Sequence, residues 1–580
     1  MHRGELSRLT LVIAAAVVNA LALAAAPQVD ATVEAAMRNL HVPGVVIAIV
    51  EADEPPLLKA YGLADVERQT PMSADSRIGL QSTTKLITGL IALRLARRGT
   101  LALDADIGSH LGSVVLPSYD GRAITLLDLL THSAGFDERS VGVSALSAAA
   151  RWPLSVYLRF QLPDRLRPAG SVASYSNHGF ALAGLVMERA ARQRLADLAE
   201  EHVFAPLGMH DSTFDPPPAR EDATRHVTGY MWRDALVPVP ELFYNDWPAS
   251  GAVSTAADMA ALMKAMLSSE GAWRDALVPR FRQHASMPAI GAGGLVEQRR
   301  GSVSTWQHGG DWQDYFNVLV LIPSRRVGIF IAGNNGEQDR LGALVLDAAL
   351  ADLEIDAGTA TASTAPPPRS DPGLLDAAFT GRYRSTRHEH DGVGKAGLLT
   401  GEIPEIALEQ GDGIRIGGRP AVLETPTTLR RDDGELWAVR AAQGGEPALL
   451  FRERAPTTAF ERVRWLQSVP VQRVLFLATL LLLVGRLAWG LRKRPLSLPT
   501  VIVAVHVFFI AGLVAVLATA DRWEFQYGAP MLLRLWLTIP LVTLAATVRA
   551  LFRTRAYATC ALSFAWCALV YEWNLWVFWR

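Results

Sequence analysis

Residues 77–90, "RIGLQSTTKLITGL", place Lys85 three residues after Ser82 at the start of an apolar stretch. Lysine is rare in this chain, because only five of its 56 Lys and Arg residues are lysine. Arginine stays protonated in proteins, whereas a buried lysine can lose its proton and act as a base. A serine hydroxyl is a weak nucleophile until a base removes its proton. The spacing therefore predicts a Ser82–Lys85 pair on one face of a helix that begins near Gln81.

Ser-x-x-Lys alone also fits an ordinary helix start at the surface. Two later stretches decide between a catalytic Ser82–Lys85 pair and that alternative. They are "SYSNHG" at 174–179 and "WQHGGDW" at 306–312. In this order, the three stretches resemble the serine hydrolases related to class C β-lactamases and penicillin-binding proteins. The marks of that family are S-x-x-K, Y-x-N and a strand with K/H-[TSG]-G. The passages "VPGVVIAIV", "ITLLDLLTHSAGF", "GAVSTAADMAALM" and "IAGNN" extend the resemblance over about residues 30 to 350.

The resemblance implies a role for each motif residue. Ser82 would be the acylated nucleophile and Lys85 its proton acceptor. Tyr175 would relay protons to the leaving group and later activate water. Asn177 would orient either the substrate amide or the Lys85 network. The backbone N–H groups of Ser82 and Asp311 would form an oxyanion hole for the tetrahedral intermediate.

The third motif departs from the β-lactamase pattern. His308 stands where β-lactamases carry lysine, Gly309 stands where Thr or Ser is common, and Gly310 completes the motif. This H-G-G form is typical of esterase and D-peptidase members, so the resemblance implies an acyl-enzyme on an ester or amide, poor β-lactamase activity, and no cofactor or metal. A penicillin-binding or β-lactam-sensing receptor, and a degenerate hydrolase domain serving a membrane scaffold or transporter, are the alternatives.

An α/β (α+β) fold is predicted for residues 27–355. Apolar strand patterns occur near its start, in "VVIAIV", and near its end, in "FNVLVLIP" and "VGIFIAGN". Helical patterns such as "FALAGLVMERAARQ" lie between them. This order predicts one antiparallel sheet built from both ends of the unit, flanked by helices, with a helical subdomain inserted.

A Pro-, Ala- and Thr-rich segment at 356–373 predicts a linker, and alternating patterns predict a small β-rich domain at 374–462. Asp412-Gly413 and Asp433-Gly434 fit hairpin turns in that domain. His388 and His390, in "RHEHD", fit a solvated loop better than a metal site, because two histidines without further matched ligands are weak evidence for a metal.

Both ends of the chain carry membrane-related signals. Basic residues, an apolar run and small residues predict a signal peptide at 1–26, cleaved after Ala24 or, less favourably, after Ala26; an uncleaved anchor is the alternative. Residues 471–580 predict a membrane domain with four transmembrane helices. The four candidate spans are 474–491, 500–520, 531–548 and 556–578.

Loop charges predict the orientation of these spans. "RKRP" at 492–495 and "RALFRTR" at 549–555 follow the first and third spans, and basic loops stay in the cytoplasm. We therefore expect a multi-pass protein of the bacterial cytoplasmic (inner) membrane, with the hydrolase unit on the periplasmic side. The expected partners are a small-molecule or peptide substrate and the lipid bilayer. Nucleic acid is not expected, because the net charge is −1 and no basic block occurs.

Overall fold

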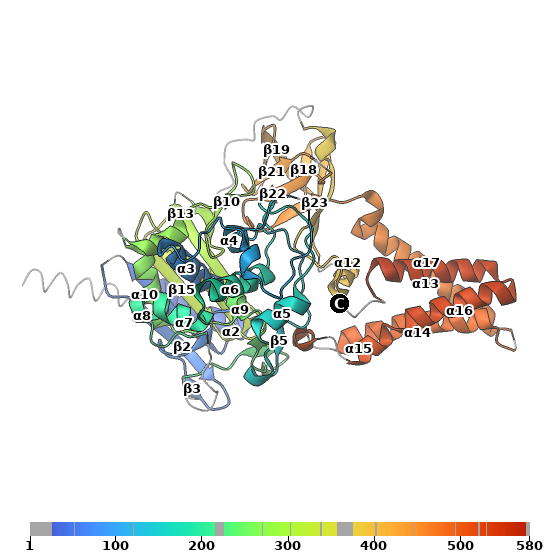
Figure 1. Cartoon of the computed structure of the whole chain (residues 1–580), viewed down its shortest axis with the longest axis horizontal. Helices are drawn as coiled ribbons and strands as arrows, with labels where there is room; N and C mark the ends of the chain where they lie inside the picture. Colours follow the sequence, from blue (N-terminus) through green and yellow to red (C-terminus); the bar gives the residue numbers. More distant parts are fainter. Residues whose placement is uncertain are drawn as a thin grey trace, which may run out of the picture.

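The computed structural model describes residues 26–575 apart from short gaps. The gaps are residues 52, 120, 215–224, 269–270, 302, 337–338, 357–374, 401–402, 444, 494, 520–521 and 529–530. The predicted signal peptide and the predicted linker therefore fall almost entirely outside the described residues. The described chain forms a sheet unit, a β-barrel and a group of C-terminal helices (Figure 1).

One antiparallel sheet of nine strands forms the first unit, in the order β10-β11-β12-β13-β14-β15-β1-β2-β3. Its strands are β1 (Gly44–Glu51), β2 (Leu57–Asp65), β3 (Thr70–Pro71), β10 (Phe281–Arg282), β11 (Ala289–Ile290), β12 (Val296–Arg300), β13 (Val303–Asp311), β14 (Phe316–Ile322) and β15 (Val327–Gly333). β1 pairs with β15 along its whole length, from Val45 opposite Gly333 to Glu51 opposite Val327. The prediction that both ends of the unit share one antiparallel sheet is confirmed.

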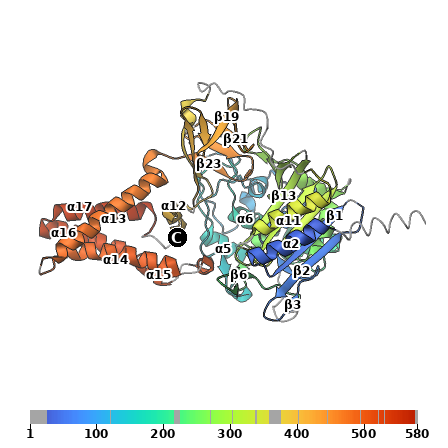
Figure 2. The same cartoon turned by 180° about the vertical axis from the view of Figure 1, so that it is seen from behind.

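Helices cover both faces of this sheet, which explains why β15 is apolar and buried throughout. α2 (Pro27–Leu40) and α11 (Asp339–Asp352) pack together over one face, as Figure 2 shows. On the other face, α10 (Ala256–Leu267) contacts β1 and β15, and α3 (Thr84–Arg97) and α6 (Asn177–Ala191) share one large buried core with it.

Short elements of the helical insertion hold the loops around the sheet. The helices are α4 (Leu126–Leu130), α5 (Leu154–Gln161), α7 (Leu195–Ala199), α8 (Ala205–Leu207) and α9 (Trp247–Ser250). The strand pairs are β4 (Ile78–Gly79) with β9 (Val253–Ser254), β5 (Ser144–Ala145) with β8 (Phe243–Tyr244), and β6 (Tyr230–Trp232) with β7 (Leu236–Pro238).

A closed barrel of eight strands follows, where the sequence predicted only a β-rich domain. Its strands are β16 (Gly381–Ser385), β17 (Glu405–Gln410), β18 (Ile414–Ile416), β19 (Arg419–Thr425), β20 (Thr428–Arg431), β21 (Leu436–Arg440), β22 (Leu449–Arg452) and β23 (Ala459–Arg462). β16 pairs with both β17 and β23, and this pairing closes the barrel and leaves no free edge. Asp412-Gly413 and Asp433-Gly434 lie in the turns after β17 and β20.

In the loop after β16, His388 is buried and the side chain of His390 is 27% exposed, so the expectation of a solvated loop is wrong for His388. The side chain of His388 is 5% exposed, and its Nδ1 donates to the carbonyl of Ser385 at 2.7 Å. Nδ1 of His390 lies 2.8 Å from Oδ1 of Asp137, and its Nε2 lies 3.5 Å from Glu461. Two carboxylates from distant parts of the chain thus face His390, raise its pKa to about 9 against the opposing effect of burial, and join the barrel to the first unit.

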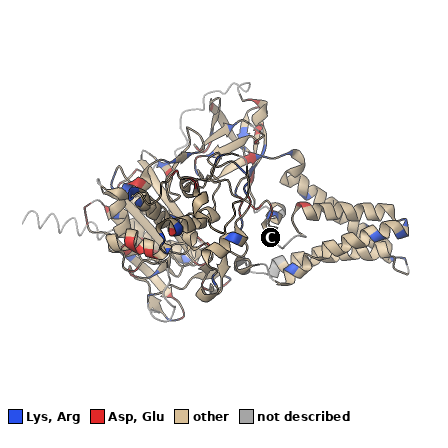
Figure 3. Ribbon diagram, viewed as in Figure 1, with Lys and Arg blue, Asp and Glu red and all other residues tan. Residues whose placement is uncertain are grey.

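The C-terminal helices are α13 (Val469–Leu491), α14 (Leu498–Thr519), α15 (Met531–Trp536), α16 (Ile539–Thr554) and α17 (Tyr557–Glu572). Three candidate spans among the described residues are long and apolar enough to cross a membrane: Val469–Leu491, Leu498–Val516 and Met531–Thr554. The predicted fourth span is not confirmed, because α17 has 16 residues and ends before Trp573. Figure 3 shows the ribbon of these helices mostly in the colour of uncharged residues, with Lys and Arg positions at the end far from the sheet.

Candidate active site

Ser82 lies in a strained turn at the start of α3. It is the middle residue of the short helix η1 (Gln81–Thr83), which leads directly into α3. Gln81 has a φ of 48°, a left-handed conformation that is unfavourable for a residue with a side chain. Two hydrogen bonds hold this conformation: Nε2 of Gln81 donates to Asp314 at 3.0 Å, and Tyr244 donates to its Oε1 at 2.8 Å. The turn therefore presents the Ser82 hydroxyl to the cavity.

Lys85 occupies the second position of α3 and is completely buried. Its Nζ lies 3.1 Å from Oγ of Ser82 and donates to the carbonyl of Ala249, on α9, at 3.0 Å. Burial lowers the pKa of Lys85 well below its ordinary value of 10.5, and the nearby carboxyl of Asp246 opposes that shift. Desolvation thus favours the neutral amine, which is the form that can accept a proton.

Tyr175 precedes α6, whose N-cap residue is Ser176. The Tyr175 ring stacks on the His132 ring, with 4.2 Å between centroids, and Nζ of Lys85 lies 4.7 Å from its centroid. Nδ1 of His132 accepts a hydrogen bond from the backbone N–H of Ser176 at 3.0 Å, which fixes the imidazole beneath Tyr175. Burial raises the pKa of Tyr175, although a hydrogen bond with Ser82 and the charge of Arg387 oppose the shift, so the phenol stays protonated at neutral pH.

The H-G-G motif lies within β13 itself, and the strand ends at Asp311. Gly310 faces η1, where a Cβ atom would approach the carbonyl oxygen of Leu80 to 2.5 Å. Only glycine permits this approach of β13 to the Ser82 turn. Gly309 and Asp311 line the cavity beside Ser82. Gly310 therefore acts on the site through close packing with the turn, while its neighbours reach the cavity.

His308 is buried on β13, and its Nδ1 donates to the carbonyl of Gly309 at 2.6 Å. Burial lowers its pKa to about 3, and the neighbouring Lys85 adds to the shift. The side chain is therefore an uncharged imidazole at neutral pH. It faces the cavity without the positive charge that a lysine would bring to the same position.

Two acceptor groups at the site have unsatisfied atoms. Oδ1 of Asn177, at the start of α6, is buried and has no hydrogen-bond partner among the described residues. Oδ1 of Asp246, which precedes α9, is likewise unpartnered within the described chain, and the residue is 1% exposed. Burial raises the pKa of Asp246 and the charge of Lys85 opposes that shift, so the two groups titrate as a pair. Both side chains line the cavity and can bind donors.

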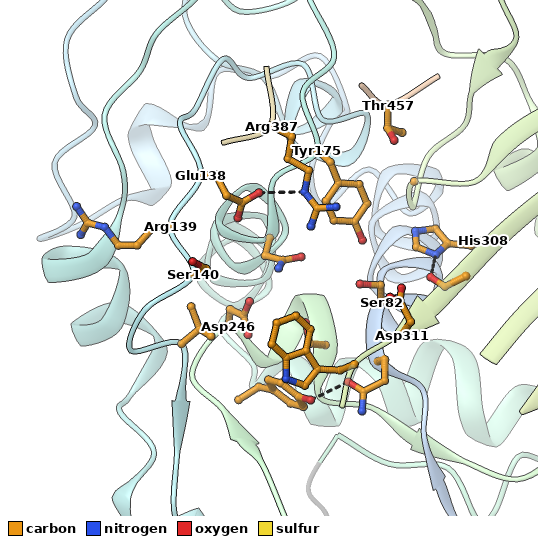
Figure 4. Close-up of a pocket in the computed structure, with 18 of the residues that line it drawn as sticks. Ser82, Glu138, Arg139, Ser140, Tyr175, Asp246, His308, Asp311, Arg387 and Thr457 are labelled. Carbon is orange, nitrogen blue, oxygen red and sulfur yellow. Dashed lines mark hydrogen bonds and ion pairs between the residues drawn. The ribbon is translucent and has the colours of Figure 1, made fainter. Parts of the chain in front are cut away.

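The barrel contributes a cation to the site. Arg387, in the loop after β16, places its guanidinium carbon 4.4 Å from the centroid of Tyr175. Its Nε donates to Oε2 of Glu138 at 3.1 Å, and its side chain remains 47% exposed to the cavity. The backbone N–H of Tyr175 also donates to the carbonyl of Thr457, on the barrel, at 3.0 Å. Figure 4 shows Arg387 above Tyr175 and Glu138 beside it.

The cavity between these groups has a volume of about 480 Å³. Of the predicted site residues, Ser82, Tyr175, Asn177, His308, Gly309 and Asp311 line it, whereas Lys85 and Gly310 lie behind its wall. The arrangement places the Ser82 hydroxyl beside the buried amine of Lys85, the protonated phenol of Tyr175 and the end of β13. Within the described residues there is no group of three or more side chains that could hold a metal ion.

The fold and this arrangement are those of a serine hydrolase. The chain belongs to the Beta-lactamase family, whose model matches residues 29–352.

Two curated relatives illustrate the family. Protein flp of Staphylococcus aureus strain MW2 is 25% identical over 317 residues, which cover 53% of this chain and 62% of flp. The chain thus spans less than two thirds of that relative. The D-alanyl-D-alanine-carboxypeptidase/endopeptidase AmpH of Escherichia coli K12 is 24% identical over 310 residues, which cover 50% of this chain and 78% of AmpH.

Solved structures match as well. A β-lactamase/D-alanine carboxypeptidase from Yersinia pestis, complexed with citrate, is 22% identical and has a TM-score of 0.49, with 58% of this chain and 98% of that chain covered. An octameric penicillin-binding protein homologue from Pyrococcus abyssi is 17% identical, also with a TM-score of 0.49, with 74% and 98% covered.

Four site residues were missed by the sequence analysis. His132 lies in the quoted passage "ITLLDLLTHSAGF", so its motif was seen but its place beside Tyr175 was not. Glu138, Asp246 and Arg387 had no local signal, because they reach the cavity from three separate loops. Only the tertiary fold brings them together.

Proposed function

We propose that this protein is a membrane-anchored extracytoplasmic hydrolase that forms an acyl-enzyme on Ser82 with an ester or amide substrate. The observation that carries the proposal is the 3.1 Å separation between Oγ of Ser82 and Nζ of Lys85, a fully buried amine with a lowered pKa. A neutral amine at this distance can take the hydroxyl proton as the oxygen attacks a carbonyl carbon.

The remaining groups fit the later steps of acyl transfer. The backbone N–H groups of Ser82 and Asp311 would donate to the developing oxyanion. The protonated hydroxyl of Tyr175 would pass a proton to the departing alcohol or amine. Lys85 would then pass the proton that it took from Ser82 to the Tyr175 oxygen, which restores both side chains. A water molecule would attack the Ser82 ester while Tyr175 takes one proton from it and gives its own to the neutral Lys85. Lys85 would return that proton to Oγ of Ser82 as the acid leaves. Asn177, with its unpartnered Oδ1, would accept a hydrogen bond from a substrate amide N–H.

We further propose that esters and D-amino-acid amides are better substrates than β-lactams. The name of AmpH describes a D-alanyl-D-alanine carboxypeptidase and endopeptidase, which makes a D-amino-acid amide one reasonable substrate class. Against β-lactams stands His308, whose lowered pKa leaves it uncharged where a lysine would hold the β-lactam carboxylate. The Arg387 guanidinium lies nearby, but it is already bonded to Glu138.

Kinetics on the purified full-length protein test this proposal. Turnover of p-nitrophenyl esters or D-amino-acid p-nitroanilides should exceed that of nitrocefin, since a lost charged contact costs about 1.5–3 kcal/mol, or roughly ten- to a hundredfold in binding. His308→Lys should narrow the gap. Efficient nitrocefin turnover by the unmodified protein at pH 8 would show that another group, such as Arg387, holds the carboxylate and that the proposal is wrong.

The membrane part of the proposal rests on the three apolar helices and on the basic residues at the ends of the first and the third. Residues 492–495 follow α13, and residues 549–555 form the end of α16 and the residue after it. Basic segments that flank a span stay in the cytoplasm. In this orientation, the start of α13 lies on the extracytoplasmic side of the membrane. The barrel and the sheet unit, which precede α13, then lie on the same side. The export signal predicted at the N-terminus agrees with the same orientation.

Reporter fusions test the orientation. A reporter that is active only outside the cytoplasm should work when fused after Val463 or at Gln526, and should fail at Arg494 or Arg553. A second reporter that is active only in the cytoplasm should give the reverse pattern and serves as the control. Extracytoplasmic activity at Arg494 would overturn the orientation and the proposed periplasmic location.

A further inference from the structure

One wall of the cavity is built on the loop between two of the apolar helices. The short helix η10 (Arg522–Tyr527) joins α14 to α15, and Gln526 lines the cavity. Oγ of Ser144 donates to Oε1 of Gln526 at 3.1 Å, and the backbone N–H of Gly142 donates to the carbonyl of Phe525 at 2.9 Å. The segment that carries Ser140 and Val143 into the cavity is therefore held by a loop of the membrane helices.

A second set of contacts joins the barrel side of the site to the end of α17 and to a residue just after it. Nδ2 of Asn574 donates to the carbonyl of His390 at 2.9 Å, and Nζ of Lys395 lies 3.6 Å from Glu572. His390 belongs to the same barrel loop as Arg387. Loops on both sides of the cavity thus contact the helices, so the position of the cavity relative to the membrane is set by several hydrogen bonds.

These contacts put the cavity close to the bilayer surface. A loop that joins two spans emerges at the edge of the hydrocarbon core, which is about 30 Å thick within a bilayer of roughly 40–45 Å. Because Gln526 stands in such a loop and in the cavity wall at once, this wall of the cavity would lie at the level of the headgroup region.

An exposed apolar patch lies beside the same loop. Its members, here called the α5 patch, are Leu146 (66% exposed), Trp152 (42%), Val156 (39%) and Phe160 (60%). They lie on α5 and on the segment between β5 and α5, and β5 contacts η10. Figure 1 shows α5 and β5 on the side of the sheet unit that faces α14 and α15. An apolar cluster exposed at this position indicates an interaction surface.

The chemistry of the patch fits a lipid headgroup layer. Trp152 and Phe160 pack edge to face, with 6.4 Å between ring centroids, and aromatic rings are enriched at the membrane–water interface. The Arg159 guanidinium carbon lies 5.5 Å from the Phe160 centroid, so a cation accompanies the apolar surface. Arginine can keep its charged head among anionic lipid phosphates while its stem rests on apolar groups.

We propose that the α5 patch rests on the outer surface of the bilayer beside α14 and α15, and that the cavity takes its ester or amide from an amphiphilic substrate held in that leaflet by an acyl chain. This inference rests on the proposed hydrolase and on the proposed membrane anchoring. This arrangement would raise the effective concentration of the substrate at the site, because the substrate and the site are confined to the same membrane surface.

Two esters with the same leaving group test the proposal. Full-length protein in phosphatidylcholine–phosphatidylglycerol vesicles would be assayed with p-nitrophenyl palmitate, which partitions into the vesicle, and with p-nitrophenyl butyrate, which stays in water. In the double variant Trp152→Ser and Phe160→Ser, the palmitate rate should fall about tenfold, equivalent to about 1.4 kcal/mol, while the butyrate rate stays within about twofold of the wild type.

Leu344→Ser is the matched control, since Leu344 is 39% exposed on α11, which lies with α2 over the face of the sheet opposite α10 (Figure 2). It should leave both rates unchanged. An unchanged palmitate rate in the patch variant, or an equal fall in both rates, would overturn the inference. A change in oligomeric mass with no change in the ratio of rates would assign the patch to a second copy of the chain and overturn it too. Failure of the hydrolase proposal looks different, because Ser82→Ala would then retain both rates.

Discussion

Replacing Ser82 with Ala should abolish covalent labelling by a fluorophosphonate probe and reduce ester hydrolysis by several orders of magnitude. The change removes one oxygen atom, which is the proposed nucleophile 3.1 Å from Nζ of Lys85. The fold should survive, because the strained conformation of Gln81 is held by its own hydrogen bonds to Asp314 and Tyr244. The measurement is probe fluorescence on a gel, together with the rate of p-nitrophenyl butyrate hydrolysis.

Ser304→Ala is the matched control for this variant. Ser304 is an exposed serine on β13, the strand that carries the H-G-G motif, but it lies outside the cavity lining. Its loss should leave labelling and hydrolysis unchanged. Labelling that persists in Ser82→Ala and vanishes in another serine variant would place the nucleophile elsewhere and refute the acyl-enzyme proposal for Ser82.

The centre of the sheet could be predicted from sequence because β1, β14 and β15 are short apolar runs. β1 and β15 read as continuous apolar runs, which is the pattern of strands covered on both faces. Closure of the barrel could not be predicted in the same way. Closure depends on the pairing of β16 with β23, whose partners are separated by the whole domain and leave no mark in local periodicity.

The candidate site residues could be named from spacing and order, but their environment required the structure. Lys85 is one helical turn from Ser82 in sequence, so its proximity follows from helix geometry. Its lowered pKa does not follow from spacing, because burial beside α9 and Tyr175 causes it. Arg387 shows most clearly what sequence patterns cannot predict. It belongs to the barrel domain and reaches the site only through tertiary contacts with Tyr175 and Glu138.

Lys85 should be intolerant of any side chain that cannot accept a proton. Lys85→Arg keeps a positive charge but remains protonated, and Lys85→Met fills a similar volume without a titratable group. Both should lower probe labelling and ester hydrolysis by several orders of magnitude. Because Lys85 is fully buried, the larger Arg side chain is expected to disturb the packing around it. The Met variant therefore separates the effect of losing the base from the effect of disturbed packing. Lys264→Arg, at a site where Nζ donates to the carbonyl of Glu54 in contact with solvent, is the control and should be neutral.

A pH profile tests the proposed role of Lys85 as proton acceptor without relying on how far the activity of a variant falls. The base must be neutral, so kcat/KM of the unmodified protein should rise with pH as the Lys85–Asp246 pair loses its proton. The carboxylate of Asp246 raises the pKa of Lys85 against the lowering by burial. Asp246→Asn removes that charge, lowers the pKa of Lys85 further and should therefore move the acid limb of the profile to lower pH. In Lys85→Met the limb should disappear from any residual activity. A limb that stays in place in both variants would show that a different group accepts the proton from Ser82.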